Sequence, residues 1–294
     1  MRVRTLTVGA EQAGRSVESL LRRELMLSSS LISRLKRRPR GILVNGERAY
    51  TTRRVETGDV LTAEVGDDPA AKRAEPMALP LHILYEDEDI LVIDKPAGIA
   101  VHASTRDPAE CTLENALSAY LPAGEIPHPV SRLDRGTTGV MTFAKNGYMH
   151  ELLRRILHTD AFFRTYLGIA AGRVDPPNGE IALPIGLAPG SGYRRAIDPN
   201  GAPSRTAYET LENTARFTLL RLIPCTGRTH QLRVHLAAVG FPLAGDWLYG
   251  VEDRSLIARP ALHSHALRIV HPLTGETLDL VSPLPDDMAR LMRL

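Results

Sequence analysis

This sequence has little of what would mark a secreted, membrane-bound or metal-binding protein. Only two cysteines, Cys111 and Cys225, occur among 294 residues, and without a C-x-x-C spacing they indicate neither a disulfide framework nor a zinc site. No apolar run approaches the ~18 residues of a membrane span, because Asp94 and Lys95 interrupt the run ILVIDKPAGIAVH. The apolar stretch at the N-terminus is too short for a secretory signal. We therefore expect a soluble, cytoplasmic protein with no membrane partner and no metal.

Aromatic residues are also scarce, at 5%, whereas a hydrophobic content of 43% and a charged content of 24% are ordinary for a globular protein. The net charge of +2 hides an uneven distribution. Residues 1–66 hold 13 Lys and Arg against 7 Asp and Glu, and the remaining residues hold 23 against 27. A basic block on a near-neutral body is typical of a nucleic-acid binder, although a solvated basic face would give the same count.

Residues 1–66 predict a small separate domain. Apolar residues at helical spacing and serine caps predict two helices within residues 16–38. A β-hairpin around the Asn45-Gly46 turn would follow them. Three arginines of the second helix would share one face: Arg34, Arg37 and Arg38. A face of this kind can bridge successive phosphates of a nucleic acid.

Residues 67–80 are polar and rich in Ala and Pro, which predicts a linker. The body, residues 81–294, mixes strand and helix patterns joined by loops too irregular for regular βαβ repeats. Its strand candidates are ILVIDKP, GVMTFAK, YLGIAAG, FTLLRLIP and TLDLVSP, and its helix candidates are TLENALSAYL and MHELLRRIL. We therefore expect an α+β fold with a mixed, largely antiparallel sheet.

The segment HPVSRLDRGTTG, from His128 to Gly139, places one carboxylate between two cations. Asp134 lies between Arg132 and Arg135 at a loop-to-strand junction. A carboxylate that nearby cations keep ionised can act as a nucleophile. Taken alone, the pattern is more typical of an ordinary salt-bridged turn. Aspartyl-phosphate chemistry is disfavoured, because it commonly needs a second carboxylate to hold Mg²⁺ and position +2 is Gly136.

The segment CTGRTHQLRVH, from Cys225 to His235, gathers several hydrogen-bond donors in a short stretch. These donors could serve phosphates or base edges, and they are Arg228, His230, Gln231, Arg233 and His235. A metal site would have to recruit both histidines of this segment, His230 and His235, together with His263, His265 and His271. No H-E-x-x-H or comparable ligand spacing occurs, so a metal site is disfavoured.

Taken in order, these segments resemble the motifs of the RluA-type pseudouridine synthases, from about Leu81 to Pro285. The resemblance rests on YEDEDILVIDKPAG, RLDRGTTG, FRTY, TGRTHQLRVH, GDWLYG and ALHSHAL. Similarly, SLISRLKRRPRGILVNGERA with Gly58-Asp59 resembles the small RNA-binding domain first known from ribosomal protein S-four. This resemblance implies a pseudouridine synthase fold preceded by an RNA-binding domain, and an enzyme that isomerises uridine in RNA, with large-subunit ribosomal RNA as the expected target.

Carried over by motif, the resemblance assigns the nucleophile to Asp134, the active-site tyrosine to Tyr166 and the basic partner of the aspartate to Arg233. Arg233 is expected to hold Asp134 by a bidentate ion pair. Arg132 matches a residue that the family associates with holding rearranged RNA. Three positions depart from the family pattern: Ser131 for histidine, Thr138 for serine and Arg164 for lysine.

The expected isomerisation needs no redox partner or group donor, so no cofactor is implied. We expect a monomer that binds RNA through Arg132, Arg135, Arg228, His230 and Gln231 in the body, and through the three arginines of the front domain. Two other functions remain open at this point. A non-catalytic RNA-binding or ribosome-assembly factor could retain the fold, and a metal-dependent hydrolase would be recognised by its sensitivity to EDTA.

Overall fold

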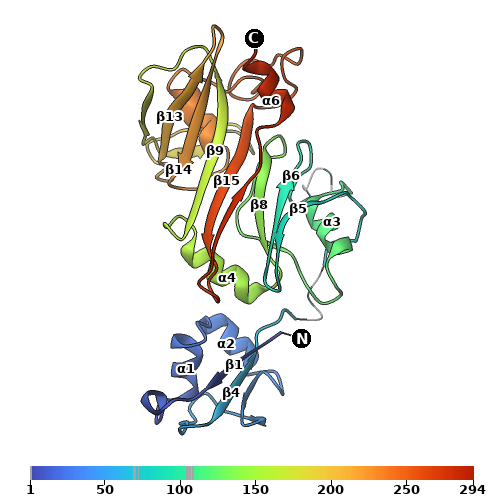
Figure 1. The fold of residues 1–294 in the computed structure, drawn as a ribbon, viewed down its shortest axis with the longest axis vertical. Helices are drawn as coiled ribbons and strands as arrows, with labels where there is room; N and C mark the ends of the chain where they lie inside the picture. Colours follow the sequence, from blue (N-terminus) through green and yellow to red (C-terminus); the bar gives the residue numbers. More distant parts are fainter. Residues whose placement is uncertain (1, 69–70, 72, 104–106, 108) are drawn as a thin grey trace.

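A computed structural model describes residues 2–68, 71, 73–103, 107 and 109–294. Residues 69, 70 and 72 of the expected linker lie outside the described residues, as does Met1. Within the described part, a small N-terminal region (residues 2–66) lies at one end of a larger body (Figure 1). No helix in this part of the chain is long and apolar enough to cross a membrane.

The N-terminal region is a four-stranded antiparallel sheet with a pair of short helices (Figure 1). The strands lie in the order β1-β4-β2-β3. The elements are β1 (Val3–Thr7), a 3₁₀ turn (Ala10–Gln12), α1 (Val17–Arg23), α2 (Ser29–Leu35), β2 (Ile42–Val44), β3 (Glu47–Arg48) and β4 (Val60–Glu64). The hydroxyl oxygens of Ser16 and Ser28 cap the two helices by accepting backbone N–H bonds. The two helices predicted for this stretch are thus confirmed.

The expected arginine face on the second helix does not form. Helix α2 ends at Leu35, before Arg37 and Arg38. Arg38 is followed by Pro39, and the residue before a proline disfavours the helical conformation. The chain therefore turns, and Arg38 pairs with Glu64 at 3.5 Å, while Arg37 stays exposed.

The body contains a ten-stranded mixed sheet. Its main strand order is β10-β13-β14-β9-β15-β8-β6-β5, with β16 paired to β15 and β7 paired to β8. Only the β15–β8 pair is parallel, so the largely antiparallel sheet predicted from the sequence is confirmed. The strands are β5 (His82–Glu86), β6 (Ile90–Lys95), β7 (His128–Pro129), β8 (Thr138–Ala144), β9 (Phe162–Ala171), β10 (Asn178–Ile181), β13 (Thr206–Asn213), β14 (Phe217–Pro224), β15 (Leu262–Val270) and β16 (Thr277–Val281).

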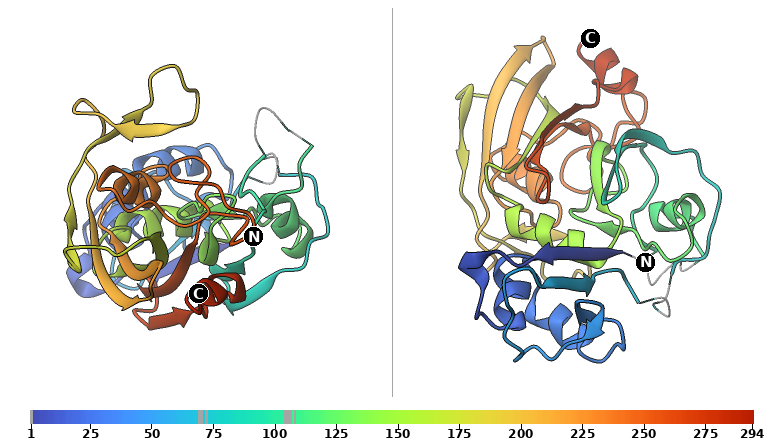
Figure 2. Two further views of the ribbon diagram at one scale, coloured as in Figure 1. Left: turned by 90° about the horizontal axis from the view of Figure 1, so that it is seen from above. Right: turned by 60° about the horizontal axis from the view of Figure 1, so that its bottom comes forward.

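Four helices and one hairpin complete the described part of the body. The helices are α3 (Leu113–Tyr120), α4 (Gly147–Ile156), α5 (Gln231–Ala238) and α6 (Asp286–Leu291), and the hairpin joins β11 (Ile185–Leu187) to β12 (Arg195–Ile197). The hairpin projects from the body (Figure 2). Predicted strands and helices in ILVIDKP, GVMTFAK, TLENALSAYL and MHELLRRIL all form.

The central strands are buried on both faces, and the two faces belong to different cores. On β6, Ile90 and Val92 face a core shared with α4, whereas Leu91 and Ile93 face a core shared with α3 and α5. Strands covered on both faces have nearly continuous apolar sequences, which explains why ILVI and VMTFA show no alternation.

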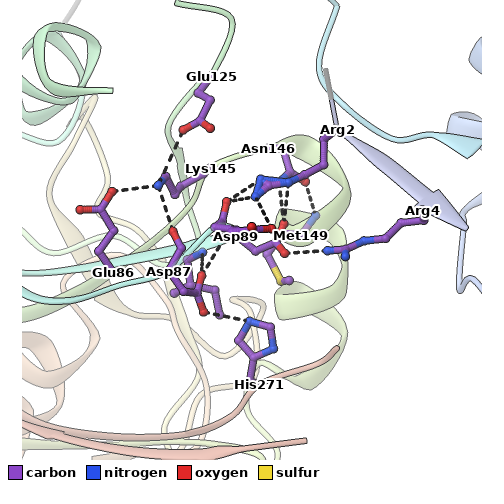
Figure 3. Close-up of polar contacts among 12 residues, drawn as sticks. Arg2, Arg4, Glu86, Asp87, Asp89, Glu125, Lys145, Asn146, Met149 and His271 are labelled. Atoms are coloured by element: carbon purple, nitrogen blue, oxygen red, sulfur yellow. Dashed lines mark hydrogen bonds and ion pairs between the residues drawn. The ribbon is translucent and has the colours of Figure 1, made fainter. Parts of the chain in front are cut away.

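The core shared with α4 continues into the N-terminal region. It includes apolar side chains of α1 and α2 together with Tyr148 and Leu152 of α4, and the Tyr148 hydroxyl donates to the Leu25 carbonyl at 2.8 Å. The carboxylate of buried Asp89 forms ion pairs with Arg2 and Arg4, at 3.1 and 2.6 Å respectively (Figure 3). Helix α4 therefore lies between the N-terminal region and the sheet (Figures 1 and 2).

The described part of the expected linker is attached to the body. Arg73 donates to the carbonyls of Ser118 and Leu121 at 2.6 and 2.7 Å, and so satisfies backbone groups at the end of α3. Asp67 accepts the Gly147 backbone N–H at 3.0 Å and contacts His128 at 2.9 Å. Residues that lack any periodic pattern can thus be held by polar contacts that the pattern does not reveal.

Candidate active site

Asp134 lies in the loop between β7 and β8, and a buried lysine stabilises this loop by hydrogen bonds. The fully buried Lys95 ammonium donates to the carbonyls of Pro96, Arg135 and Thr137 at 2.9, 3.0 and 3.0 Å. Burial lowers the pKa of Lys95 to about 8, although the negative charge of Asp134 opposes this shift. Two carbonyls of the chain that directly follows Asp134 are therefore fixed by one charged group.

The loop enters β8 through a glycine that has no substitute. Gly139 has a φ of 105°, and a Cβ there would overlap the Ser264 carbonyl of β15. Only glycine combines this backbone conformation with so close an approach. The final glycine of RLDRGTTG thus permits the parallel β15–β8 contact that lies directly beyond the Asp134 loop.

Arg233 on α5 connects Asp134 to a second, deeper carboxylate. Its Nη1 donates to Asp134 Oδ2 at 3.0 Å, whereas its Nε and Nη2 donate to Asp246 Oδ2 and Oδ1, both at 2.8 Å. Burial alone would lower the pKa of the Arg233 guanidinium, but the bonds to Asp246 and Asp134 outweigh burial and raise it. The arginine is therefore permanently charged.

The prediction that Arg233 forms a bidentate ion pair with Asp134 is wrong. The bidentate partner is Asp246, whose side chain has no exposed surface, and Asp134 receives a single bond. A guanidinium has only one fork of this geometry, and the buried carboxylate uses it. Asp134 remains 26% exposed and keeps Oδ1 free of hydrogen bonds from the part of the chain that the structure describes.

His230 also faces Asp134, and it stands at the start of α5 in a left-handed conformation, with a φ of 57°. Its Nε2 lies 3.9 Å from Asp134 Oδ2, and its Nδ1 lies 2.8 Å from the Tyr249 hydroxyl. Desolvation lowers the pKa of His230, in opposition to the nearby charge of Asp134. Burial therefore favours the neutral imidazole.

A cleft of about 1030 Å³ opens beside Asp134. Tyr166 on β9 lines it with only 6% of its surface exposed, so the ring forms part of a wall. Asp134, Tyr166 and Arg233, which the sequence places far apart, line this same cleft. The structure therefore brings together the three residues expected at the catalytic site.

The cleft is basic around a single acid. Among its described lining residues, Asp134 is the one carboxylate, against arginines at 132, 135, 154, 164, 228 and 233 and histidines at 102, 128, 150, 158 and 230. No carboxylate of the described chain pairs with Arg132, Arg154, Arg164 or Arg228. Free cations around one carboxylate suit a polyanion that delivers one reactive group to Asp134.

The remaining residues expected to bind RNA differ in how they are placed. Arg132 is exposed in the cleft, 3.5 Å from the Thr229 hydroxyl. Arg135 lines the cleft, but its guanidinium forms two hydrogen bonds with Glu110. Arg228 is exposed, and its Nε donates to the Pro203 carbonyl at 3.3 Å. Hence Arg132 and Arg228 keep charge available to a ligand.

The side chain of Gln231 forms hydrogen bonds within the protein, in place of the expected contact with RNA. It is 4% exposed, its Oε1 accepts from the Arg228 backbone, and its Nε2 donates to the Arg205 carbonyl and the Thr206 hydroxyl. A buried amide must satisfy its donors and acceptors locally, and this one closes the loop before α5. Unlike Gln231, the three N-terminal arginines at 34, 37 and 38 are not among the residues that line the cleft.

Two of the histidines considered for a metal site, His235 and His263, form hydrogen bonds within the fold. His235 bonds the Thr206 hydroxyl and the Leu183 carbonyl, and His263 bonds the Thr138 hydroxyl and the Ser282 carbonyl. No group of three or more His, Cys, Asp or Glu side chains that could hold a metal ion occurs among the residues searched, which are the described ones.

Three important residues escaped the interpretation of the sequence. Lys95 and Asp246 are fully buried charges, and Tyr249 contacts His230. All three belong to recognised segments, namely KPAG and GDWLYG. A charged residue next to apolar strand residues, as in VIDKP, is the signal that could have identified the buried lysine, because lysine is almost never fully buried without partners.

Comparison with known proteins places this geometry in context. The family described as RNA pseudouridylate synthase matches residues 89–238. The chain is 34% identical to an uncharacterized RNA pseudouridine synthase, YjbO, of Bacillus subtilis, over 92% of this chain and 96% of that protein. It is 38% identical to ribosomal large subunit pseudouridine synthase D of Nitrosomonas europaea, over 86% and 76% of the two chains.

One solved structure has a similar fold. Human RNA pseudouridylate synthase domain containing 4 is similar with a TM-score of 0.59 and 26% identity, over 72% of this chain and 92% of that chain. The matched family segment contains Asp134, Tyr166 and Arg233, whereas Asp246 and Tyr249 lie just beyond it.

Proposed function

The chain belongs to the RNA pseudouridylate synthase family and is an enzyme that isomerises uridine in RNA to pseudouridine, and we propose that Asp134 carries the chemistry. One observation supports this assignment above the others. Among the described residues that line the basic cleft, Asp134 is the one carboxylate, and it is anchored at one oxygen by Arg233 while the other oxygen stays free of hydrogen bonds from the described chain. A site of this kind offers a fixed, ionised nucleophile to a bound polyanion.

The reaction breaks the N1–C1′ glycosidic bond of uridine and forms a C5–C1′ bond after the uracil has turned. The proton on C5 is lost and N1 ends protonated, so substrate and product have the same composition and no cofactor is consumed. Asp134 would bond to C1′, add to C6 of the base or remove a sugar proton. Each route needs the ionised carboxylate, and Arg233 holds one of its oxygens in place with a hydrogen bond of 3.0 Å.

Tyr166 is the proposed contact for the base. Its nearly buried ring lines the cleft that holds Asp134, and an aromatic face stacks well on uracil. Such a wall would keep the detached base in place while it turns. Because the target nucleotide must leave its stack at a cost of a few kcal/mol, contacts elsewhere in the cleft have to offset that cost.

We assign this role to Arg132 and Arg228 near Asp134, and to a basic wall beside α4. This α4 wall consists of Arg154, His158 and Arg164. Helix α4 also contacts the N-terminal region through Tyr148. The wall therefore offers an RNA strand a basic path from Asp134 toward residues 1–66.

Large-subunit ribosomal RNA is the substrate we propose. Support comes from the name of the Nitrosomonas europaea relative and from the basic charge of residues 1–66, which we propose to be an S-four-like RNA-binding domain. Residues 81–294 would form the catalytic domain. We further propose that the enzyme acts as a monomer, since one chain supplies the whole cleft, and in the cytoplasm, where the free thiols of Cys111 and Cys225 would stay reduced.

The substrate is tested in cells that lack the gene. Carbodiimide treatment and primer extension across large-subunit ribosomal RNA should lose at least one pseudouridine stop, which wild-type protein restores and the Asp134→Asn variant does not. Restoration by Asp134→Asn would overturn the role of Asp134. An unchanged ribosomal RNA profile would overturn the choice of substrate and leave the chemistry to be tested on other RNA.

A further inference from the structure

His230 occupies a backbone conformation that histidine rarely adopts. With a φ of 57° and a ψ of 16°, it begins α5 in the left-handed region. Non-glycine residues in this region are uncommon and tend to cluster at functional sites. The conformation directs its ring to the space between Tyr249 and Asp134, where one nitrogen approaches each of them.

The contact with the Tyr249 hydroxyl fits either tautomer of His230, and the charge of Asp134 distinguishes between the two. Its oxygen accepts the Arg195 backbone N–H at 2.9 Å and lies 2.8 Å from His230 Nδ1. If Nδ1 carried the proton of the neutral ring, the lone pair of Nε2 would face the negative Oδ2 of Asp134. If Tyr249 instead donates to Nδ1, the proton is on Nε2 and faces that oxygen favourably.

The second arrangement closes a ring of contacts around Asp134. Asp134 Oδ2 accepts from Arg233, Arg233 is held by Asp246, and Asp246 Oδ1 accepts the Tyr249 backbone N–H at 3.2 Å. The Tyr249 hydroxyl then reaches His230, whose Nε2 returns to Asp134 Oδ2. Arg233 thus donates a hydrogen bond to Oδ2 at 3.0 Å, a second N–H faces Oδ2 from 3.9 Å, and Oδ1 has no hydrogen bond from the described chain.

We propose that His230 and Tyr249 are positioning residues that fix Asp134 Oδ2 through an Nε2–H tautomer and leave Oδ1 as the reacting oxygen. This inference rests on the proposed function of Asp134 and goes beyond it by naming the oxygen that reacts. The Arg195 backbone belongs to β12, so the projecting β11–β12 hairpin is tied to the same network.

A purely structural role for Tyr249 predicts something different. Its ring packs between the guanidinium groups of Arg233 and Arg194, at 5.1 and 5.8 Å from its centroid. If packing were its whole contribution, phenylalanine would replace tyrosine without changing the protonation of His230. The tautomer therefore separates the two roles.

The first experiment is nitrogen NMR of protein labelled with ¹⁵N at the histidine rings, in the absence of RNA and near pH 7. The wild-type His230 signals, assigned through the His230→Gln variant, should show a protonated Nε2 and an unprotonated Nδ1. Tyr249→Phe should shift them toward a mixture of tautomers. A protonated Nδ1 in the wild type, or no change in Tyr249→Phe, overturns the inference without any assay of activity.

The second experiment measures single-turnover conversion of uridine and RNA affinity in parallel. Tyr249→Phe should slow conversion about tenfold, the effect of losing roughly one hydrogen bond, here the one between the Tyr249 hydroxyl and His230, with an unchanged Kd for RNA. His230→Ala should slow it further, and His230→Gln should recover part of the loss because its amide nitrogen can replace Nε2. Tyr120→Phe, which removes a tyrosine hydroxyl of α3 that donates to Glu86, is the matched control.

The outcomes distinguish this inference from the proposed function. Full activity of Asp134→Asn would remove the function itself. Full activity of both His230→Ala and Tyr249→Phe, alongside an inactive Asp134→Asn, would overturn only the positioning role.

Discussion

The Asp134 end of the cleft and the α4 wall belong to one cleft but are built in opposite ways. The charged groups that hold the Asp134 loop and carboxylate are buried and paired: Asp246 and Lys95 have no exposed surface, and Arg233 bonds to both aspartates. Along the α4 wall, Arg154 is exposed, and no carboxylate of the described chain pairs with Arg154 or Arg164. A reacting group needs fixed geometry, whereas phosphate contacts tolerate side chains that adapt.

This comparison predicts that changes at the Asp134 end affect rate and stability, and that changes on the wall affect affinity. Asp246→Asn gives the largest effect after the nucleophile itself. It leaves the buried Arg233 guanidinium without its bidentate partner, which should cost about 3–5 kcal/mol of unfolding free energy and slow single-turnover conversion about 100-fold. Chemical denaturation and tritium release from labelled uridine measure the two effects.

Asp279→Asn is the control for Asp246→Asn, because it breaks an exposed ion pair with Arg268. Its unfolding midpoint should equal that of the wild type. If Asp246→Asn also behaved like the wild type, the buried pair would not hold the site and the contrast between the two ends of the cleft would fail.

Lys95→Met tests the support beneath the Asp134 loop through pH. The pKa of Lys95 is lowered by burial from 10.5 to about 8, so between these values the unfolded chain binds more protons than the folded chain. The stability of the wild type relative to Lys95→Met must then rise as pH increases from about 8 to about 10.5, by about 3 kcal/mol at most. Urea denaturation of both proteins across this range measures the difference. A difference that is flat or falls with pH would contradict the buried, charged support.

The double variant Arg154→Gln/Arg164→Gln tests the α4 wall. It should weaken RNA binding about tenfold, and the dependence of log Kd on log salt should fall by about one for each phosphate that is no longer neutralised, with conversion of bound RNA unchanged. Arg155→Gln is the matched control on the same helix, since Arg155 pairs with Glu151 at 2.8 Å and does not line the cleft. Equal affinities of the double variant and the control would remove the wall from the RNA path.

Arg37→Ala tests the N-terminal region with the smallest expected effect. Arg37 is exposed, and its neighbour Arg38 is paired with Glu64. Removing one cation that neutralises a phosphate should raise the Kd for RNA about two- to threefold, with a salt dependence lower by about one. Fluorescence anisotropy with labelled RNA measures both. A Kd and a salt dependence equal to those of the wild type would mean that Arg37 does not touch the RNA.

Substitution is preferable to deletion here, because residues 1–66 share a core with α4. Removing them would expose Tyr148 and Leu152, and weaker binding could then follow from unfolding.

The sequence predicted the elements whose patterns are local. Buried strands such as VMTFA, the helix in MHELLRRIL and the Asp134 loop follow from apolar runs, helical spacing and charge order within short segments. The pairing of Asp134 with Arg233 followed from family motifs and not from spacing. Asp134 and Arg233 are far apart along the chain. The sheet brings them together, because β8 and β14 belong to one layer.

The rest depends on contacts that no local pattern encodes. Arg233 forms its bidentate ion pair with Asp246, because leaving a fully buried carboxylate unpaired costs more free energy than leaving an exposed one unpaired. The N-terminal region is tied to the body through Asp89, a residue that the sequence places in an acidic turn. In both cases burial decides the partner, and burial is a property of the assembled fold.

The most direct test of the account is tritium release by purified Asp134→Asn from RNA labelled at C5 of uridine, with RNA affinity measured on the same sample. We predict no release above background under single-turnover conditions, and a Kd within about threefold of the wild type, because one neutralised carboxylate leaves the basic cleft intact. Conversion by Asp134→Asn at a rate near that of the wild type would contradict the central claim.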